Sequence, residues 1–140
     1  MSIDVHFSSK TNEWATPQAF FDELNSEFHF TLDPCATIDN AKCSQFITEE
    51  QDGLSQPWGQ NSVFMNPPYG RGIGQWIEKA YRESLAGATV VCLIPARTDT
   101  AAWHNFIFGK AEVRFVRGRL KFGEATENAP FPSAVVIFRP

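Results

Sequence analysis

The stretch VFMNPPYG, residues 63–70, holds the residues whose types and spacing best fit chemistry. Pro67 and Pro68 fix φ and lack backbone N–H groups, so the corner is stiff and presents carbonyl oxygens without competing donors. Asn66 adds a side-chain oxygen acceptor, and Tyr69 adds a ring that can stack on a flat group. The four residues together predict a catalytic clamp for a planar group that carries an NH₂.

Two acceptors aimed at one amino group favour a pyramidal nitrogen whose lone pair is less conjugated with its ring. Such a nitrogen is a better nucleophile towards a sulfonium methyl, and in-line positioning supplies much of the remaining rate. The alternative interpretation is an ordinary turn after a strand, where Asn and Pro are common. The apolar run that precedes the corner favours the functional interpretation.

The elements that must position this corner alternate between strand and helix. Thr16 and Pro17 predict the cap and first position of a helix over 17–28. Apolar spacing further predicts helices over 73–86 and from Asp99 through Phe108. The expected strands are 28–33, a short one near Phe46-Ile47, 62–65, 89–94, 112–118 and 133–138.

This alternation predicts one domain, residues 1–140, with an open and mostly parallel α/β sheet and an antiparallel C-terminal edge. Ligands bind at the carboxyl ends of strands in such sheets. The candidate loops are therefore residues 33–36, 66–70 and 95–99, each of which directly follows an expected strand.

Composition excludes several classes of protein. The 140 residues contain no apolar run long enough to cross a membrane, and the polar N-terminus lacks the apolar core of a signal peptide. Three widely spaced cysteines without a CxxC pair support neither a zinc site nor a disulfide framework. We therefore expect a cytoplasmic protein.

Charge is distributed unevenly along the chain. The net charge is −4, yet residues 110–123 contain five basic residues and one acidic residue. A local basic surface on an acidic protein can bind a polyanion, although a solvated hairpin explains the same pattern.

At this point the chain resembles the phage-type DNA N-6-adenine methyltransferases, the Dam family. The matching segments are EWATP (13–17), FTLDPCA (30–36), DGL (52–54), VFMNPPYG (63–70), LIPART (93–98), GRLKFG (118–123) and APFPSAVVIF (129–138). The resemblance implies a Rossmann-like class I methyltransferase fold, a compact three-layer sandwich. It also implies S-adenosyl-L-methionine as methyl donor, adenine in double-stranded DNA as acceptor, and a bacterial or phage-infected host cell as location.

The resemblance also implies roles for individual residues around the cofactor. Asp33, Pro34 and Ala36 match the first cofactor loop, Thr16 and Pro17 match a segment that closes over the cofactor, and Asp52 matches an acceptor for the cofactor's adenine amine. The sequence departs from the family's usual glycine-rich form, because TIDNAK follows DPCA. We therefore expect side chains of that segment to contact the cofactor, where the usual form of the family brings the backbone close to it. The alternative for Asp33 is a turn or helix cap after a strand, and the alternative for Asp52 is an Asp-Gly turn.

A target adenine must leave the duplex to reach such a site. Tyr69 is expected to stack on one face of it and Phe131 on the other, with core packing as the alternative for Phe131. Arg119 and Lys121 are the best phosphate contacts, and Arg71 and Arg97 could bind phosphate or the cofactor carboxylate.

No separate target-recognition domain fits in this length, so we expect loops to recognise the DNA sequence. The specificity is then either loose or shared between the two subunits of a homodimer. Two other functions use the same features. One is methylation of RNA bases or glutamine side chains, and the other is DNA binding by a non-catalytic relic of the fold.

Overall fold

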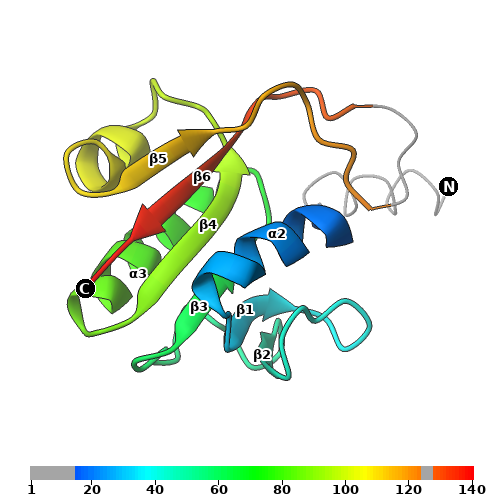
Figure 1. Cartoon of the computed structure of the whole chain (residues 1–140). Coiled ribbons are helices and arrows are strands. Elements are labelled where there is room, and N and C mark those ends of the chain that lie inside the picture. The colour runs from blue at the N-terminus through cyan, green and yellow to red at the C-terminus, as the bar shows by residue number, and fades with distance from the viewer. Residues whose placement is uncertain (1–14, 124–127) are drawn as a thin grey trace, which may run out of the picture.

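The computed structural model describes residues 15–123 and 128–140. Its sheet has six strands in the order β2-β1-β3-β4-β6-β5 (Figure 1). The strands β1 (Leu32–Ala36), β2 (Gln45–Thr48), β3 (Ser62–Met65) and β4 (Thr89–Pro95) pair in parallel. The strands β5 (Glu112–Phe115) and β6 (Ser133–Phe138) complete an antiparallel edge, with β6 between β4 and β5. The predicted sheet is therefore confirmed.

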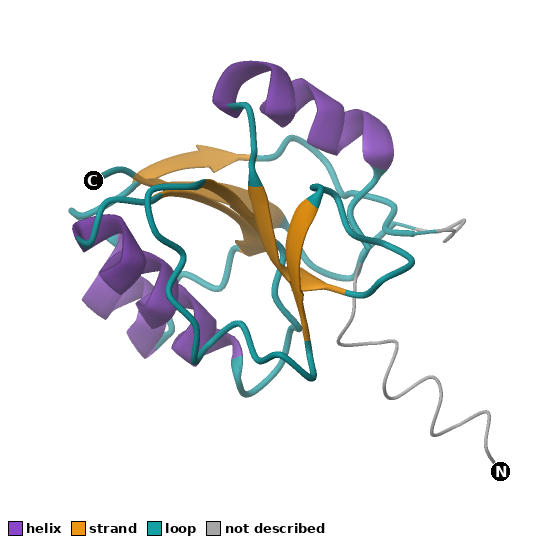
Figure 2. Cartoon of the chain, turned by 90° about the horizontal axis from the view of Figure 1, so that it is seen from below, coloured by secondary structure: helices purple, strands orange, loops and turns teal. Residues whose placement is uncertain are grey.

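Helices cover both faces of this sheet, which makes a three-layer sandwich (Figure 2). Helix α2 (Gln18–Phe28) lies on one face, and helix α3 (Ile73–Leu85) with the π-helical turn η1 (Trp103–Ile107) lies on the other. Successive side chains of a strand point to opposite faces. Phe64 accordingly packs in the α2 layer, whereas Val63 and Met65 pack in the layer of α3 and η1.

The first helix and first strand differ from the prediction. Pro17, with ψ 133°, is the last residue before α2, and Thr16 makes no cap to it. The helix ends when His29 takes φ 51° and the Asn25 side chain accepts a hydrogen bond from the Phe30 N–H. The expected strand at 28–33 is therefore wrong, because its aromatic alternation belongs to the helix end and the link to β1, which continues through the DPCA segment.

The chain between β1 and β3 is short of regular structure. Residues 37–61 contain only β2, and loops replace the helices that a conventional doubly wound sheet has there. The expected helix from Asp99 is also shorter, because its last part winds as the π-helical turn η1. The expected strands near Phe46, at 62–65 and at 133–138 are confirmed. Within the described ranges, no helix is long and apolar enough to cross a membrane.

Candidate active site

A cavity of about 530 Å³ opens at the carboxyl ends of β1, β2 and β3. Neighbouring strands β1 and β3 are joined in sequence through β2, which lies on the other side of β1, so the strand order reverses here. Ligands of open α/β sheets bind at such switch points. The predicted residues that line this cavity are Thr16, Asp33, Pro34, Ala36, Asp52, Asn66, Pro67 and Pro68.

Prolines open the cavity between the two strands. Strand β1 pairs with β3 at Leu32 and Val63. Its pairing with β2 is irregular between Asp33 and Ala36. Pro34 lies within this irregularity, where a residue without an N–H is tolerated. Pro67 ends the pairing of β3 in the same way. The strands diverge beyond these points, and the site lies between them.

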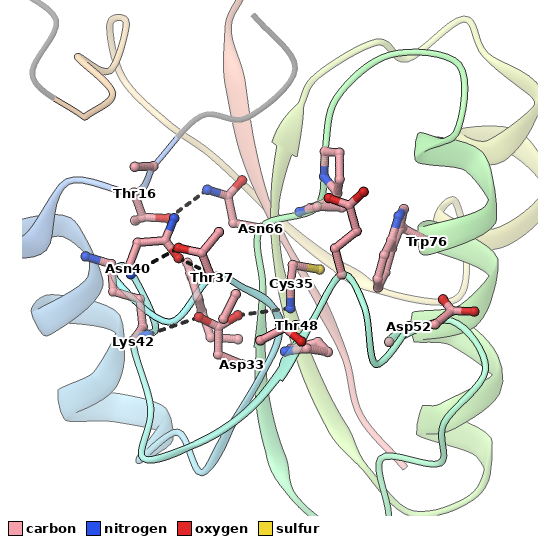
Figure 3. Close-up of a pocket in the computed structure, with 18 residues that line it drawn as sticks. Thr16, Asp33, Cys35, Thr37, Asn40, Lys42, Thr48, Asp52, Asn66 and Trp76 are labelled. Atoms are coloured by element: carbon pink, nitrogen blue, oxygen red, sulfur yellow. Dashed lines mark hydrogen bonds between the residues drawn. The ribbon is translucent and has the colours of Figure 1, made fainter. Parts of the chain in front are cut away.

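Asn66 is held by hydrogen bonds on both ends of its side-chain amide. Its Nδ2 donates to Oγ1 of Thr16 over 2.9 Å (Figure 3). Its Oδ1 accepts from the phenol of Tyr69 over 2.9 Å. The same phenol lies 3.0 Å from the backbone oxygen of Leu93 in β4. The amide plane is therefore fixed relative to the sheet before any ligand arrives.

The Tyr69 ring does not line the cavity. Its side chain is buried, and the ring meets those of Phe131 and Phe122 edge to face, with centroids 5.4 and 6.2 Å away. Burial raises the pKa of the Tyr69 phenol, so the group stays a neutral donor. In this arrangement the two rings contact each other, as in the core packing given as the alternative for Phe131. Stacking of the target adenine between them stays a prediction.

Asp33 is a buried carboxylate with 5% of its surface exposed. Its Oδ1 accepts from the N–H of Cys35 over 3.1 Å, and its Oδ2 accepts from the N–H of Lys42 over 3.0 Å. Burial raises the pKa of this carboxyl, while the two hydrogen bonds act in the opposite direction. Asp33 therefore shapes the loop after β1 and also contributes to the cavity wall, so both interpretations of this residue apply.

Asp52 and Gly53 form a tight turn on the far side of the cavity. Asp52 has φ 58°, and its side chain accepts a hydrogen bond from the N–H of Leu54. A Cβ on Gly53 would lie 2.4 Å from the backbone oxygen of Pro34 and 2.9 Å from the Trp76 ring. Only glycine allows this approach, so the turn and the end of β1 form one continuous floor.

Three lining residues carry chemistry that the sequence alone did not reveal. Lys42 is a cation that donates to Gln18 of α2, Glu49 follows the end of β2, and the half-buried Trp76 stacks on Trp58 at 6.5 Å. Lys42 and Thr16 lie on one side of the cavity, and Asp52 and Trp76 on the other, with Asn66 between them (Figure 3). The helical spacing of Trp76 indicated only a core residue.

The segment after DPCA offers side chains to the cavity, as the missing glycine suggested. Thr37 and Asn40 both line it and fix each other, since each accepts a hydrogen bond from the other's backbone N–H. Asp39 belongs to the same segment but does not line the cavity, whereas Glu49, which follows β2, does.

The remaining predicted residues lie outside this cavity. Pro17 only precedes α2. Arg71 and Arg97 are exposed around a second cavity, so they are poorly placed for a cofactor carboxylate in the first. Arg119 and Lys121 are exposed on the segment before residue 124, where Arg119 donates to the backbone oxygen of Ala129. The structure thus separates these four cations from the cavity. The EW of EWATP lies outside the described residues.

Comparison with known proteins adds an independent finding. Residues 6–140 match the family model described as DNA N-6-adenine-methyltransferase (Dam). The DNA N-6-adenine-methyltransferase of Haemophilus phage HP1 (strain HP1c1) is 30% identical over 135 residues, which cover 91% of this chain and 78% of the phage protein. The DNA N-6-adenine-methyltransferase of Escherichia phage T1 is 28% identical over 109 residues, or 76% of this chain and 45% of that protein. The putative methyltransferase YfdM of Escherichia coli (strain K12) is 35% identical over 65 residues, 41% of this chain and 71% of YfdM.

Proposed function

The chain belongs to the DNA N-6-adenine-methyltransferase (Dam) family, and we propose that it transfers a methyl group from S-adenosylmethionine to the exocyclic amine of an adenine in DNA. The observation that carries this proposal is the meeting of Asn66, Pro67 and Pro68 with the acidic and aromatic groups of one cavity at the switch point of the sheet. The residues that would bind the amine therefore lie next to those that would bind a nucleoside-containing cofactor.

The cavity fits the cofactor in size and in chemistry. Its volume of about 530 Å³ lies within the usual range for small-molecule sites. Lys42 supplies a cation for the amino-acid carboxylate, and Glu49 supplies a carboxylate at the end of the second strand, where Rossmann-like folds bind ribose hydroxyls. The Trp76 ring and Asp52 would hold the adenine on the opposite side. Asn66 lies between these two sides, so a cofactor held by them would bring its sulfonium close to this amide.

The chain's own contribution to the reaction is the preorganised amide. Asn66 Oδ1 and a backbone oxygen of the proline corner accept hydrogen bonds from the target amine, and the contacts to Thr16 and Tyr69 prevent the amide from rotating away. When bound, S-adenosylmethionine would supply an electrophilic methyl group whose sulfur leaves as a neutral thioether, and the proton lost from the amine would pass to solvent.

DNA binding is proposed for the exposed cations outside the cavity. Among the described residues, the ion pairs engage Lys79, Arg82, Arg114 and Arg139 with carboxylates. Arg71, Arg97, Arg119 and Lys121 take no part in those pairs, so they remain available to phosphate. The adenine must be extruded from the duplex, because the Asn66 amide lies inside a cavity rather than on a convex surface.

The direct test offers labelled S-adenosylmethionine with DNA, RNA or protein substrates and then maps the modified positions at base resolution. We expect label in DNA, at the N6 position of adenine. Label in RNA or on glutamine would assign another acceptor. A protein that gives no saturable heat with the cofactor would be a DNA-binding relic.

A further inference from the structure

A second cavity, of about 320 Å³, lies on the other side of the NPPY corner. Its floor is apolar and is formed by Ile73 and Ile77 of α3, Pro95 at the end of β4, and Trp103 of η1. Gly74 in the first turn of α3 faces Ala102, and a Cβ there would lie 3.8 Å from the Ala102 Cβ. The small residues at this crossing leave the space between α3 and η1 open.

Two arginines stand at the rim of this apolar hollow. Arg71 and Arg97 are exposed and line the cavity, and no described carboxylate pairs with either of them. The backbone of Arg97 is anchored, because its carbonyl accepts from both the N–H and the hydroxyl of Thr100. An apolar floor under two guanidinium groups suits a flat ring joined to phosphate.

The second cavity and the amine clamp share one wall. Pro67 and Pro68 line the first cavity, and Gly70 and Arg71, the residues that directly follow the corner, line the second. A strand that passes over this wall could place its target base in the first cavity. The neighbouring nucleotide then arrives at the rim where the two arginines lie.

We propose that the second cavity is a nucleotide subsite for the DNA strand that carries the target. Arg71 and Arg97 bind the phosphate beside the target, and the floor between α3 and η1 receives a base next to it. This inference rests on the proposed function of the first cavity. The subsite would supply sequence preference for the base next to the target.

The phosphate contacts are tested with Arg71→Ala and Arg97→Ala in the full-length protein. We expect each variant to bind duplex DNA several-fold more weakly, and the slope of log affinity against log salt to fall by about one per lost contact. Cofactor binding should not change, because neither residue lines the first cavity. Arg82→Ala is the matched control, since this exposed arginine lies in the last turn of α3, at the other end of the helix from Gly74, and pairs with Glu78.

The base contact is tested with Gly74→Leu, which fills the hollow without removing a charge. We expect Gly74→Leu to change the flanking-base preference when methylated adenines of genomic DNA are mapped. Ala86→Leu, which adds the same side chain at the exposed far end of α3, should leave the preference as in the wild type. Photocrosslinking with 5-iodouracil next to the target should label the tryptic peptides 72–79 or 98–110.

The outcomes separate the two proposals. Absence of N6-methyladenine with the wild-type protein overturns the proposed function, and the subsite with it. Normal methylation, combined with unchanged salt slope and flanking preference in all three variants, overturns the subsite alone. Crosslinks confined to other peptides do the same.

Discussion

The phenol oxygen of Tyr69 lies 2.9 Å from Oδ1 of Asn66, so the tyrosine of the NPPY corner supports the neighbouring amide rather than presenting its ring to the cavity. The phenol reaches the carbonyl of Leu93 as well. The two prolines after β3 have no N–H groups, so the backbone there cannot donate hydrogen bonds to β4. The contact between Tyr69 and Leu93 connects the corner to β4 instead. Substitutions can distinguish residues that support the Asn66 amide from residues that contact a ligand.

Tyr69→Phe distinguishes support from stacking. The variant keeps the ring and removes the donor from the Leu93 carbonyl and the Asn66 amide, so we expect a loss of about 1–3 kcal/mol in the free energy of unfolding, with reduced turnover. Denaturant titration and steady-state kinetics measure the two effects. If Tyr69→Phe has the stability and turnover of the wild type, the ring is needed and the hydroxyl group is not.

Asn66→Ala should reduce turnover about a hundredfold or more, because in the proposed mechanism the amide oxygen accepts a hydrogen bond from the reacting amine. Cofactor affinity should change much less. Single-turnover kinetics and calorimetry with S-adenosylmethionine give the two values. Equal losses in both would make Asn66 an architectural residue.

Thr16→Val should lower turnover by up to about tenfold, the equivalent of one net hydrogen bond. Valine keeps the shape of the buried side chain and removes the acceptor for Asn66 Nδ2. Thr16→Ser retains the hydroxyl and should restore turnover. If serine is as impaired as valine, the methyl group and its packing carry the effect.

Trp76→Ala should weaken S-adenosylmethionine binding by about tenfold, since stacking on a ring contributes roughly 0.5–1.5 kcal/mol beyond area burial. Trp76→Phe should recover part of this loss. Isothermal titration supplies the dissociation constants, and DNA affinity measured without cofactor is the control. Unchanged cofactor affinity in the alanine variant would leave Trp76 as a packing residue against Trp58.

Asp33 should leave a signature in the pH dependence of stability. Burial raises the pKa of its carboxyl in the folded chain above the ordinary value of 3.8, so the folded state binds this proton more tightly than the unfolded state. The contribution of Asp33 to stability is therefore fully present below pH 3.8 and falls as the pH rises through the raised pKa.

Asp33→Asn isolates this effect, because other carboxylates titrate alike in both proteins. The free energy of unfolding of the wild type, relative to Asp33→Asn, should decrease between acidic and neutral pH. Chemical denaturation at several pH values measures the difference. An increase over that range would mean that the hydrogen bonds from Cys35 and Lys42 outweigh the cost of burial.

The sequence predicts the sheet well where burial is continuous. The runs at 62–65, 89–95 and 133–138 are apolar because both faces of these strands are covered, and the NPPY corner could be placed at a strand end for that reason. The first strand was misplaced because the aromatic residues at the end of α2 imitate strand alternation. The cap made by Asn25 is what distinguishes the two.

The candidate site was predicted only in part, for a physical reason. Local pattern locates Asn66 and Asp33 but does not say which way a side chain turns once the chain folds. Tyr69 turns inward because Leu93 and Phe131, distant in sequence, meet it there. Trp76 and Lys42 likewise become wall residues only when α3 and the loop before β2 converge on the end of β1.

The close approach of Gly53 to Pro34 has a consequence for how this scaffold can diversify. A substitution that adds a side chain at position 53 collides with the peptide oxygen of Pro34 as well as with the Trp76 ring. Main chain at Pro34 therefore limits the width of the cavity here, and a larger residue at position 53 would disturb it. Variation in ligand preference among related proteins is expected instead at lining side chains such as Thr37, Asn40 and Glu49.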